Sequence, residues 1–539
     1  MKCQLYRLRS SKQRLLPFLL FVLLLGACKK TILQLPNPDS PTPGASLITE
    51  GGIDAFAQGM FYKWIAYETG DGNLNFFDIA WLMESNMGDE DFSPYSNFGG
   101  RYPMNISTIT LPAPYNTVVH NPSGFTTSLD ILRAENTRTA GDGNSIQYEW
   151  DCFYYVNAQA NTLLLALDNP SLQFTGDAAT KKKLLQAWAY YWKGYCYSKL
   201  GSLYLAAIID DSPDSTAKGL TSNVYVSHTD VIAAANRNFD QAASLFGSIT
   251  ENADYDATFK AIIPSFNLPN QVITPAMWLH QIHTFEARNY LANHKVATMA
   301  SSDWTTVLNL ATSGMAKNDY TLQWGMSPTG INDLTSFGFF FHPYARHTIA
   351  GGALSFVSER LIQDFRPGDQ RFVKWFGPYP TGTVVNVLSR GIQFGTRYGV
   401  IDIENGGKYA SENHLGTVPI APTWEENALM IAEADIYLGQ TDNGAQLIDQ
   451  VRAAQGAALP ALAGTGISMD SAIAHLHSER RIGLYLHNTS WYDARRWGVT
   501  APAAQGGGRA NANVVIPGTL INKTAATVLP CFIDYSFVD

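Results

Sequence analysis

The chain has 539 residues, of which 46% are hydrophobic and 15% are charged, and its formal net charge is −9. This composition describes a packed globular protein and excludes an intrinsically disordered one. The acidic balance argues against nucleic-acid binding, because a protein that holds phosphates needs a basic surface.

The N-terminus has the order of a lipoprotein export signal. Basic residues precede an apolar run over residues 15–25, which is shorter than the ~20 apolar residues that span a bilayer. The run ends in Leu25-Gly26-Ala27-Cys28, the order of a bacterial lipobox. We predict that residues 1–27 are a signal peptide and that lipid chains on Cys28 anchor the protein to a membrane. Residues 28–46, rich in proline, are predicted to tether a single domain over residues 47–539.

The first part of this domain alternates predicted helices with irregular segments. Apolar periodicity predicts helices over residues 53–67 and 76–83. Residues 89–122 lack periodicity and are rich in proline, glycine and aromatic side chains, a composition typical of a functional loop. Two antiparallel helix pairs are predicted next, and they span 147–167 with 181–200 and 230–246 with 275–299.

Single residues mark where some of these helices should begin and end. Gly201 is predicted to end the helix over 181–200 in a left-handed conformation. Asp303 is predicted to cap a short helix through residue 315. A second irregular segment follows over 325–352, and residues 359–409 have a mixed pattern with short strand-like runs. Four tryptophans at helical positions are predicted to be core residues: Trp188, Trp192, Trp304 and Trp424.

The C-terminal third returns to clear helices. Thr423 and Glu426 form a capping box ahead of a helix that ends at Gly439, and further helices are predicted over 444–454 and 468–486. Helix pairs in which small alanines face large side chains are typical of tetratricopeptide-like repeats, which stack to bury their apolar faces. We therefore predict a mainly α fold, a tetratricopeptide-like helix-pair scaffold with long irregular loop insertions.

Charged and aromatic residues crowd together between residues 478 and 498. Arginines beside tryptophans suggest paired and stacked guanidinium groups. Such a cluster could read a carboxylate or phosphate. An internal lattice is favoured, because charges among helix-core residues must be paired when buried, with the two acids pairing with neighbouring arginines. The residues of this structural signature are Glu479, Arg480, Arg481, Trp491, Asp493, Arg495, Arg496 and Trp497.

The segments 428–434, 447–452, 478–481 and 491–498 resemble the SusD/RagB family of outer-membrane lipoproteins, which capture nutrients and usually glycans. The resemblance implies a SusD-like α-helical domain in which four tetratricopeptide-like units support an irregular ligand-binding half. It implies a partner, a SusC-like TonB-dependent transporter that the lipoprotein covers as a lid. It also implies a place on the outer membrane, facing the cell exterior, and it does not imply catalysis.

Loop aromatics are the candidate ligand-binding residues. A sugar ring packs its apolar face on an aromatic ring, and its hydroxyls need amide or charged side chains at the rim. Family members carry a ligand-contacting loop after the first helices, and each of these residues could instead plug its own loop. The candidates are Tyr95, Asn97, Phe98, Arg101 and Tyr102, together with Trp324 at the edge of the second irregular segment.

Other chemistry finds little support in the sequence. His475, His477 and Glu479 point to different faces of a helix and are not expected to share a metal ion. Cys152 and Cys196 are predicted to be small core residues. No motif of a hydrolase or a phosphate-binding loop is present. We predict a binding protein with no enzyme activity, cofactor or metal. The alternatives left open are a binding protein for peptide, a scaffold for membrane partners and a lipid-anchored hydrolase.

Overall fold

The computed structural model describes residues 47–66, 83–92, 108–120, 146–212, 224–263, 271–325, 356–378, 394–400 and 417–535, together with residue 268 and a few residues between 134 and 144. The predicted signal peptide, the lipidated cysteine and the tether lie outside these residues. So do most of the predicted helix over 76–83 and most of the two irregular segments.

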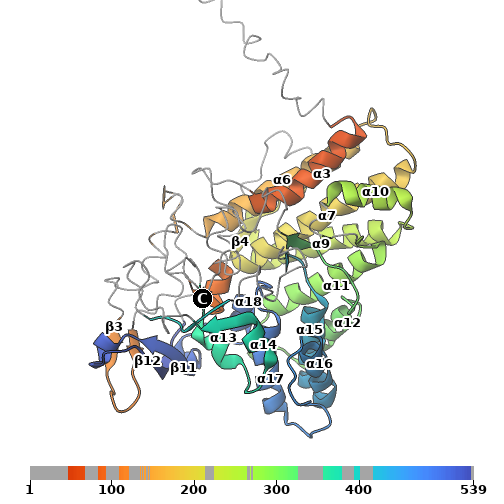
Figure 1. The fold of residues 1–539 in the computed structure, drawn as a ribbon. Helices are drawn as coiled ribbons and strands as arrows, with labels where there is room; N and C mark the ends of the chain where they lie inside the picture. The colour runs from red at the N-terminus through yellow and green to blue at the C-terminus, as the bar shows by residue number, and fades with distance from the viewer. Residues whose placement is uncertain are drawn as a thin grey trace, which may run out of the picture.

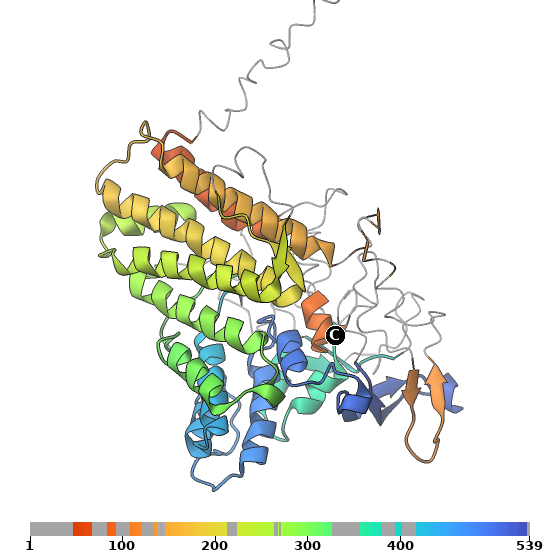
Figure 2. The same ribbon diagram turned by 180° about the vertical axis from the view of Figure 1, so that it is seen from behind.

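Helices packed side by side form the first part of the fold (Figures 1 and 2). They are α3 (Glu50–Ala66), α6 (Gln147–Leu167), α7 (Ala178–Leu203), α9 (His228–Gly247), α10 (Ala253–Ile262), α11 (Pro275–Ala292) and α12 (Ser301–Thr312). The central helix α7 carries Trp188 and Trp192, whose rings meet edge to face with centroids 5.4 Å apart. Both rings are fully buried, so the aromatic face of α7 forms the centre of the main core.

The C-terminal helices continue the scaffold, and the first of them packs against α12. They are α15 (Trp424–Tyr437), α16 (Thr441–Ala454), α17 (Met469–Gly483) and α18 (Ser490–Arg496). The ring of Trp304 on α12 stacks on that of Tyr437 on α15 at a centroid distance of 4.2 Å. Leu429, Ile448 and Leu476 form a second core between α15, α16 and α17. Within the described residues the fold is mainly helical, which confirms the predicted fold class.

Short strands lie beside this scaffold. An antiparallel sheet has the order β11-β12-β2-β3, built from β11 (Arg509–Ile516), β12 (Thr527–Ile533), β2 (Thr108–Thr110) and β3 (Val118–His120). The remaining strands pair in twos: β1 (Asp91–Phe92) with β7 (Phe356–Val357), β4 (Ala206–Ile208) with β5 (Tyr225–Ser227), β6 (Gln323–Gly325) with β10 (Thr417–Pro419), and β8 (Phe376–Pro378) with β9 (Tyr398–Val400). In chain order, two short helices lie between β7 and β8: α13 (Glu359–Asp364) and α14 (Gln370–Trp375).

Several predicted helix boundaries are wrong. Gly201 does not end α7 but lies inside it, where a Cβ atom would come 2.9 Å from the side chain of Ile232 on α9. Asp303 is not the N-cap of α12; it lies one turn inside, and its carboxylate accepts the N–H of Ala300. The helix predicted over 275–299 ends at Ala292, and a 3₁₀ turn follows over Val296–Thr298.

Two further differences concern helices that the sequence pattern misjudged. Helix α10 was not predicted, although Asn252 caps it by accepting the N–H of Tyr255. Helix α17 ends at Gly483 rather than at residue 486, because the chain turns through left-handed conformations at Leu486 and Asn488. Thr423 caps α15 as predicted, but the side chain of Glu426 pairs with Arg288 instead of completing the capping box.

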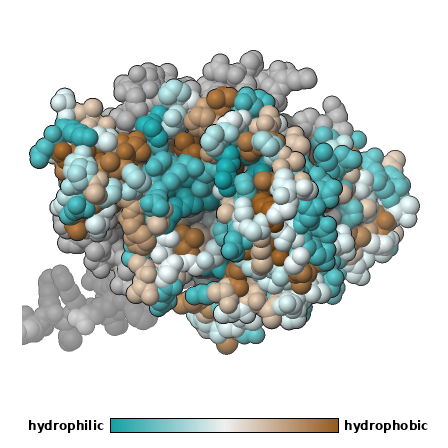
Figure 3. All heavy atoms as spheres, turned by 90° about the horizontal axis from the view of Figure 1, so that it is seen from below, coloured by the Kyte–Doolittle hydropathy of each residue, from teal (hydrophilic) through white to brown (hydrophobic). Residues whose placement is uncertain are grey.

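The core predictions for single residues are mostly confirmed. Cys152, Cys196 and Trp304 are buried, as are Trp188 and Trp192. Trp424 is only half-buried. None of the described helices combines the length and the apolar character needed to cross a membrane. Figure 3 shows hydrophilic residues over much of the face seen from below, with smaller apolar areas between them.

Candidate functional site

The signature residues of α17 and α18 form a buried network of ion pairs. Asp493 accepts hydrogen bonds from Nε of Arg480 at 2.7 Å and from Nε of Arg496 at 2.8 Å. Both terminal nitrogens of Arg496 donate to Glu433 on α15, at 2.7 and 2.6 Å, and Trp497 donates its indole N–H to the same carboxylate. Burial alone would raise the pKa of Glu433, but the charge and hydrogen bonds of Arg496, together with the charge of Arg480, lower that pKa. The network therefore joins α18 to the scaffold.

Glu479 has partners that its neighbours in sequence did not suggest. Its carboxylate accepts from Arg371 of α14 at 2.5 and 3.0 Å and from Nε of Arg452 of α16 at 2.9 Å. The predicted pairing of Glu479 with Arg480, Arg481, Arg495 or Arg496 is therefore wrong for this residue. Buried carboxylates need partners on all sides. Here these partners come from two distant helices.

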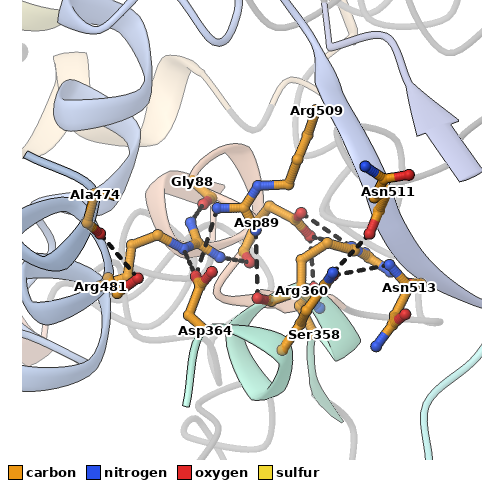
Figure 4. A network of polar contacts seen from close by, with 12 residues as sticks. Gly88, Asp89, Ser358, Arg360, Asp364, Ala474, Arg481, Arg509, Asn511 and Asn513 are labelled. Atoms are coloured by element: carbon orange, nitrogen blue, oxygen red, sulfur yellow. Dashed lines mark hydrogen bonds and ion pairs between the residues drawn. The ribbon is translucent and has the colours of Figure 1, made fainter. Parts of the chain in front are cut away.

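Arg481 connects α17 to α13 and to residues 88–89, and Arg360 connects α13 to strand β11 by donating to the carbonyl of Asn513 (Figure 4). Arg481 donates from Nε to Asp364 at 2.5 Å and from its terminal nitrogens to the carbonyls of Gly88 and Asp89. Arg360 forms an ion pair with Asp89 at 2.8 Å. Burial alone would raise the pKa of the Asp89 carboxyl, but the charge and hydrogen bonds of Arg360, together with the charges of Arg481 and Arg509, hold that pKa well below its usual range.

Arg495 binds backbone carbonyls at two helix ends. Its terminal nitrogens donate to the carbonyls of Ser202 at 2.7 Å and Ala292 at 2.9 Å, near the ends of α7 and α11. The guanidinium lies over the ring of Trp491, 4.7 Å from its centroid. A cation is favourable at helix C-termini, where carbonyls lack intrahelical donors. Arg495 thus connects three helices.

The two histidines of α17 lie in different surroundings. His475 accepts from Arg452, with Nδ1 and the guanidinium nitrogen 3.1 Å apart, whereas His477 stacks on Trp497 at a centroid distance of 3.7 Å. Burial, together with neighbouring arginines, lowers the pKa of both rings to about 4. Among the described residues, no group of three or more His, Cys, Asp or Glu side chains could hold a metal ion.

Most of the candidate ligand-binding residues lie outside the described part of the chain. Tyr95, Asn97, Phe98, Arg101 and Tyr102 are among them, so they stay predictions. Cys28 also lies outside the described residues, so its lipidation stays a prediction. Trp324 lies in β6, opposite Val418 of β10.

Strand β6 borders a cleft of about 490 Å³, which we call the β6 cleft. Its walls come from the segment after α12, the start of α15, the end of α14 and strand β10, so it lies between the helical scaffold and the irregular half. Aromatic and polar side chains line it together, namely Tyr320, Trp375, Trp424, Gln271, Gln323, Gln455, Asp319, Glu425 and Lys317. The sequence pattern does not single out Tyr320, and it predicts Trp424 as a core residue.

Hydrogen bonds hold the walls of the β6 cleft in place. Asp319 pairs with Nδ1 of His280 at 2.8 Å and accepts the N–H of Ala316 at 2.6 Å. Gln455 donates to the carbonyl of Gly483 at 2.8 Å. Lys317 lies over the ring of Trp424, with its amine 5.4 Å from the centroid. The ring of Tyr320 remains exposed, at 37% of its surface.

The mixture of side chains suits a polyhydroxylated ligand. Aromatic faces can receive the C–H face of a sugar ring, and amide and carboxylate groups can pair with its hydroxyls. A volume of about 490 Å³ lies within the ~300–1,000 Å³ of typical small-molecule sites. The cleft therefore has the size and the chemistry of a glycan-binding site.

Comparisons with known proteins find one family model and several solved structures of similar fold. The family model described as "SusD family" matches residues 426–525. No curated protein matches the sequence. A SusD-like carbohydrate-binding protein from Bacteroides vulgatus has 15% sequence identity and a TM-score of 0.51, with 90% of this chain and 93% of that chain covered. A SusD-like carbohydrate-binding protein from Bacteroides fragilis has 13% identity and a TM-score of 0.53, with 88% and 90% covered.

A further solved structure, described as a complex with xylogluco-oligosaccharide, has 14% identity and a TM-score of 0.52, with 86% of this chain and 89% of that chain covered. These likenesses establish the fold. The family model matches the C-terminal helices α15 to α18 and the strand β11, where the signature residues lie. Residues 426–525 therefore resemble the SusD family, and the chain shares the fold of the SusD-like structures.

Proposed function

We propose that this protein is a lipid-anchored, cell-surface binding protein that captures an oligosaccharide and delivers it to a SusC-like TonB-dependent transporter. The family is one of carbohydrate-binding proteins, and one structural neighbour is described with a bound xylogluco-oligosaccharide. The observation that carries the proposal for this chain is the β6 cleft, in which aromatic rings and amide side chains face one cavity. The lipobox supports the anchor, and the family supports the transporter.

In this proposal the cleft binds and orients the glycan without chemical change. One sugar ring packs on the exposed ring of Tyr320, and its hydroxyls exchange hydrogen bonds with Gln323 and Gln271 at the rim. Delivery then requires only that the glycan is released into the transporter when the lipoprotein closes over it as a lid.

Calorimetric titration of the mature protein in detergent tests the proposal. Neutral oligosaccharides, including xylogluco-oligosaccharides, should bind to the wild type. Tyr320→Ala should weaken binding by about tenfold, which corresponds to about 1.4 kcal/mol. A matched control is Phe532→Ala, because this ring on β12 is similarly exposed, at 43% against 37% for Tyr320. The control should bind like the wild type.

Other outcomes of the same experiment select the alternatives. Binding of peptides and not of glycans would favour a binding protein for peptide. Tight binding to a barrel partner with no small-molecule ligand would favour a scaffold. Release of products from a polysaccharide would support a hydrolase.

A further inference from the structure

A second groove lies where α6 begins, close to strands β4 and β5. Figures 1 and 2 show these segments side by side. Its volume is about 580 Å³, and it shares no lining residue with the β6 cleft. We call it the Tyr225 groove. The side chains that matter for its chemistry are Trp150, Tyr204, Tyr225, Asn144, Gln147 and Asp151.

Three aromatic rings form one wall of the Tyr225 groove. The rings of Tyr225 and Trp150 lie nearly parallel, at 26°, with centroids 6.1 Å apart. Tyr204 meets Trp150 edge to face at 5.1 Å, and its hydroxyl donates to the carbonyl of Ile146. These contacts hold the rings of Trp150 and Tyr204 in place. Tyr225 is exposed over 62% of its surface, so it presents a ring to solvent on a rigid support.

Polar side chains at or just before the start of α6 also line the groove. Gln147 donates to Asp151 at 3.0 Å, and Asn144, which is buried, donates to Asn136 at 3.4 Å. The carbonyl oxygen of the Gln147 side chain is buried and accepts no hydrogen bond from any described residue. A buried acceptor without a donor costs stability. A ligand hydroxyl that enters the groove would supply the missing donor.

The charges of the groove indicate a neutral ligand. Among its described lining residues, Asp151 is the only charged side chain, so the groove offers no cation to a carboxylate, a sulfate or a phosphate. Asp151 is exposed and would repel such groups. Flat aromatic surface combined with amide and carboxylate acceptors fits the apolar faces and the hydroxyl donors of uncharged sugar rings.

We propose that the Tyr225 groove is a second glycan-binding site, in which a neutral sugar ring packs on Tyr225 and donates a hydroxyl to the side-chain carbonyl of Gln147. This inference rests on the proposed function, because it assumes that the protein binds glycans. Two separate grooves on one protein would hold a long glycan at two points and raise its apparent affinity through a high effective concentration.

Three variants separate this groove from the β6 cleft. Tyr225→Ala removes the exposed ring and should weaken binding at one class of sites by about tenfold or more. Tyr225→Phe keeps the ring and should bind like the wild type. Leu205→Ala is the matched control, since this neighbouring side chain is exposed over 90% of its surface and does not line the groove. The mature protein is titrated with an array of neutral oligosaccharides that includes xylogluco-oligosaccharide.

A direct probe of the groove is the nitration of Tyr225 by tetranitromethane, followed by mass spectrometry. Bound neutral oligosaccharide should slow nitration of Tyr225, and it should do so equally in the Tyr320→Ala variant. Sugar that protects Tyr320 but not Tyr225, with unchanged binding by Tyr225→Ala, would overturn the second site and leave the proposed function intact. Failure of the wild type to bind any glycan would overturn both.

Discussion

Replacing Arg496 with methionine should destabilise the protein, because the substitution leaves the carboxylate of Glu433 in the core without its ion-pair partner. The wild-type contacts are two hydrogen bonds of 2.7 and 2.6 Å from Arg496 to Glu433. Both side chains are almost completely buried. Within the described residues, Glu433 would keep only the indole N–H of Trp497 at 3.1 Å. Methionine is similar in length to arginine, so little packing is lost.

The expected loss is about 3–5 kcal/mol, which is typical when one partner of a buried ion pair is removed. The second acid of the network, Asp493, keeps its hydrogen bond from Arg480. Its contribution is therefore largely retained, and the cost falls on Glu433. A double variant, Glu433→Leu with Arg496→Met, removes both charges and should recover much of the loss.

The loss should also depend on pH. Burial raises the pKa of Glu433, and Arg496 at present outweighs that effect. Without Arg496 the pKa in the folded state rises, so the ionised carboxylate is disfavoured in the variant. The loss is therefore complete above the variant's pKa and shrinks as the pH falls through it, by up to about 1.4 kcal/mol per pH unit.

Equilibrium urea unfolding, followed by tryptophan fluorescence at pH 7.5 and pH 5, measures both effects. Lys182→Met is the control, since its ion pair with Asp168 is exposed and 3.5 Å long, and such pairs contribute less than about 1 kcal/mol. A loss of free energy of unfolding below about 1 kcal/mol for Arg496→Met at pH 7.5 would show that Glu433 does not depend on Arg496 as its ion-pair partner. An equal loss at the two pH values would refute the assignment of the cost to Glu433.

Three further predictions concern other parts of the network and the scaffold. Burial raises the pKa of Asp91 to about 7, so the wild type loses stability as the pH rises from about 4 to 7. Asp91→Asn should therefore be more stable than the wild type at pH 8, by up to about 4 kcal/mol in urea unfolding. Equal stability of the two proteins at pH 8 would contradict the prediction. Arg495→Ala removes two hydrogen bonds to helix-end carbonyls and should lower the free energy of unfolding by about 1.5–3 kcal/mol in thermal unfolding. Calorimetry should show unchanged glycan affinity. A large loss of affinity with an unchanged melting temperature would instead make Arg495 a ligand contact. Gly194→Ala places a Cβ atom 2.6 Å from the ring of Phe239 and should lower the free energy of unfolding by about 1–3 kcal/mol in urea. Gly51 has open space around it, so Gly51→Ala should raise the free energy of unfolding by about 0.5–1 kcal/mol. Similar changes for the two glycines would rule out overpacking.

The candidate site could be read from the sequence only in part. Loop aromatics predict a site around Tyr95, in residues that the structure does not describe. They also predict Trp324, whose strand borders the β6 cleft. The sequence pattern does not single out Tyr320, and it predicts Trp424 as a core residue because helical spacing does not show which side of a helix remains exposed to solvent. Exposure depends on the packing of neighbouring helices, and the sequence does not specify that packing.

The positions of most helices could be predicted from the sequence alone. Helix α6 has the bounds that its apolar pattern predicts, Gln147–Leu167, because helical periodicity is a local property of the chain. The signature residues of α17 and α18 also stand out in the sequence, since charged and aromatic residues rarely crowd together in this way. Only the tertiary structure decided which residues Glu479 binds. Arg371 and Arg452 lie 108 and 27 residues away, and the stacking of helices brings them together. The two grooves arise for the same reason, because each is formed by segments that become neighbours only when the scaffold is assembled.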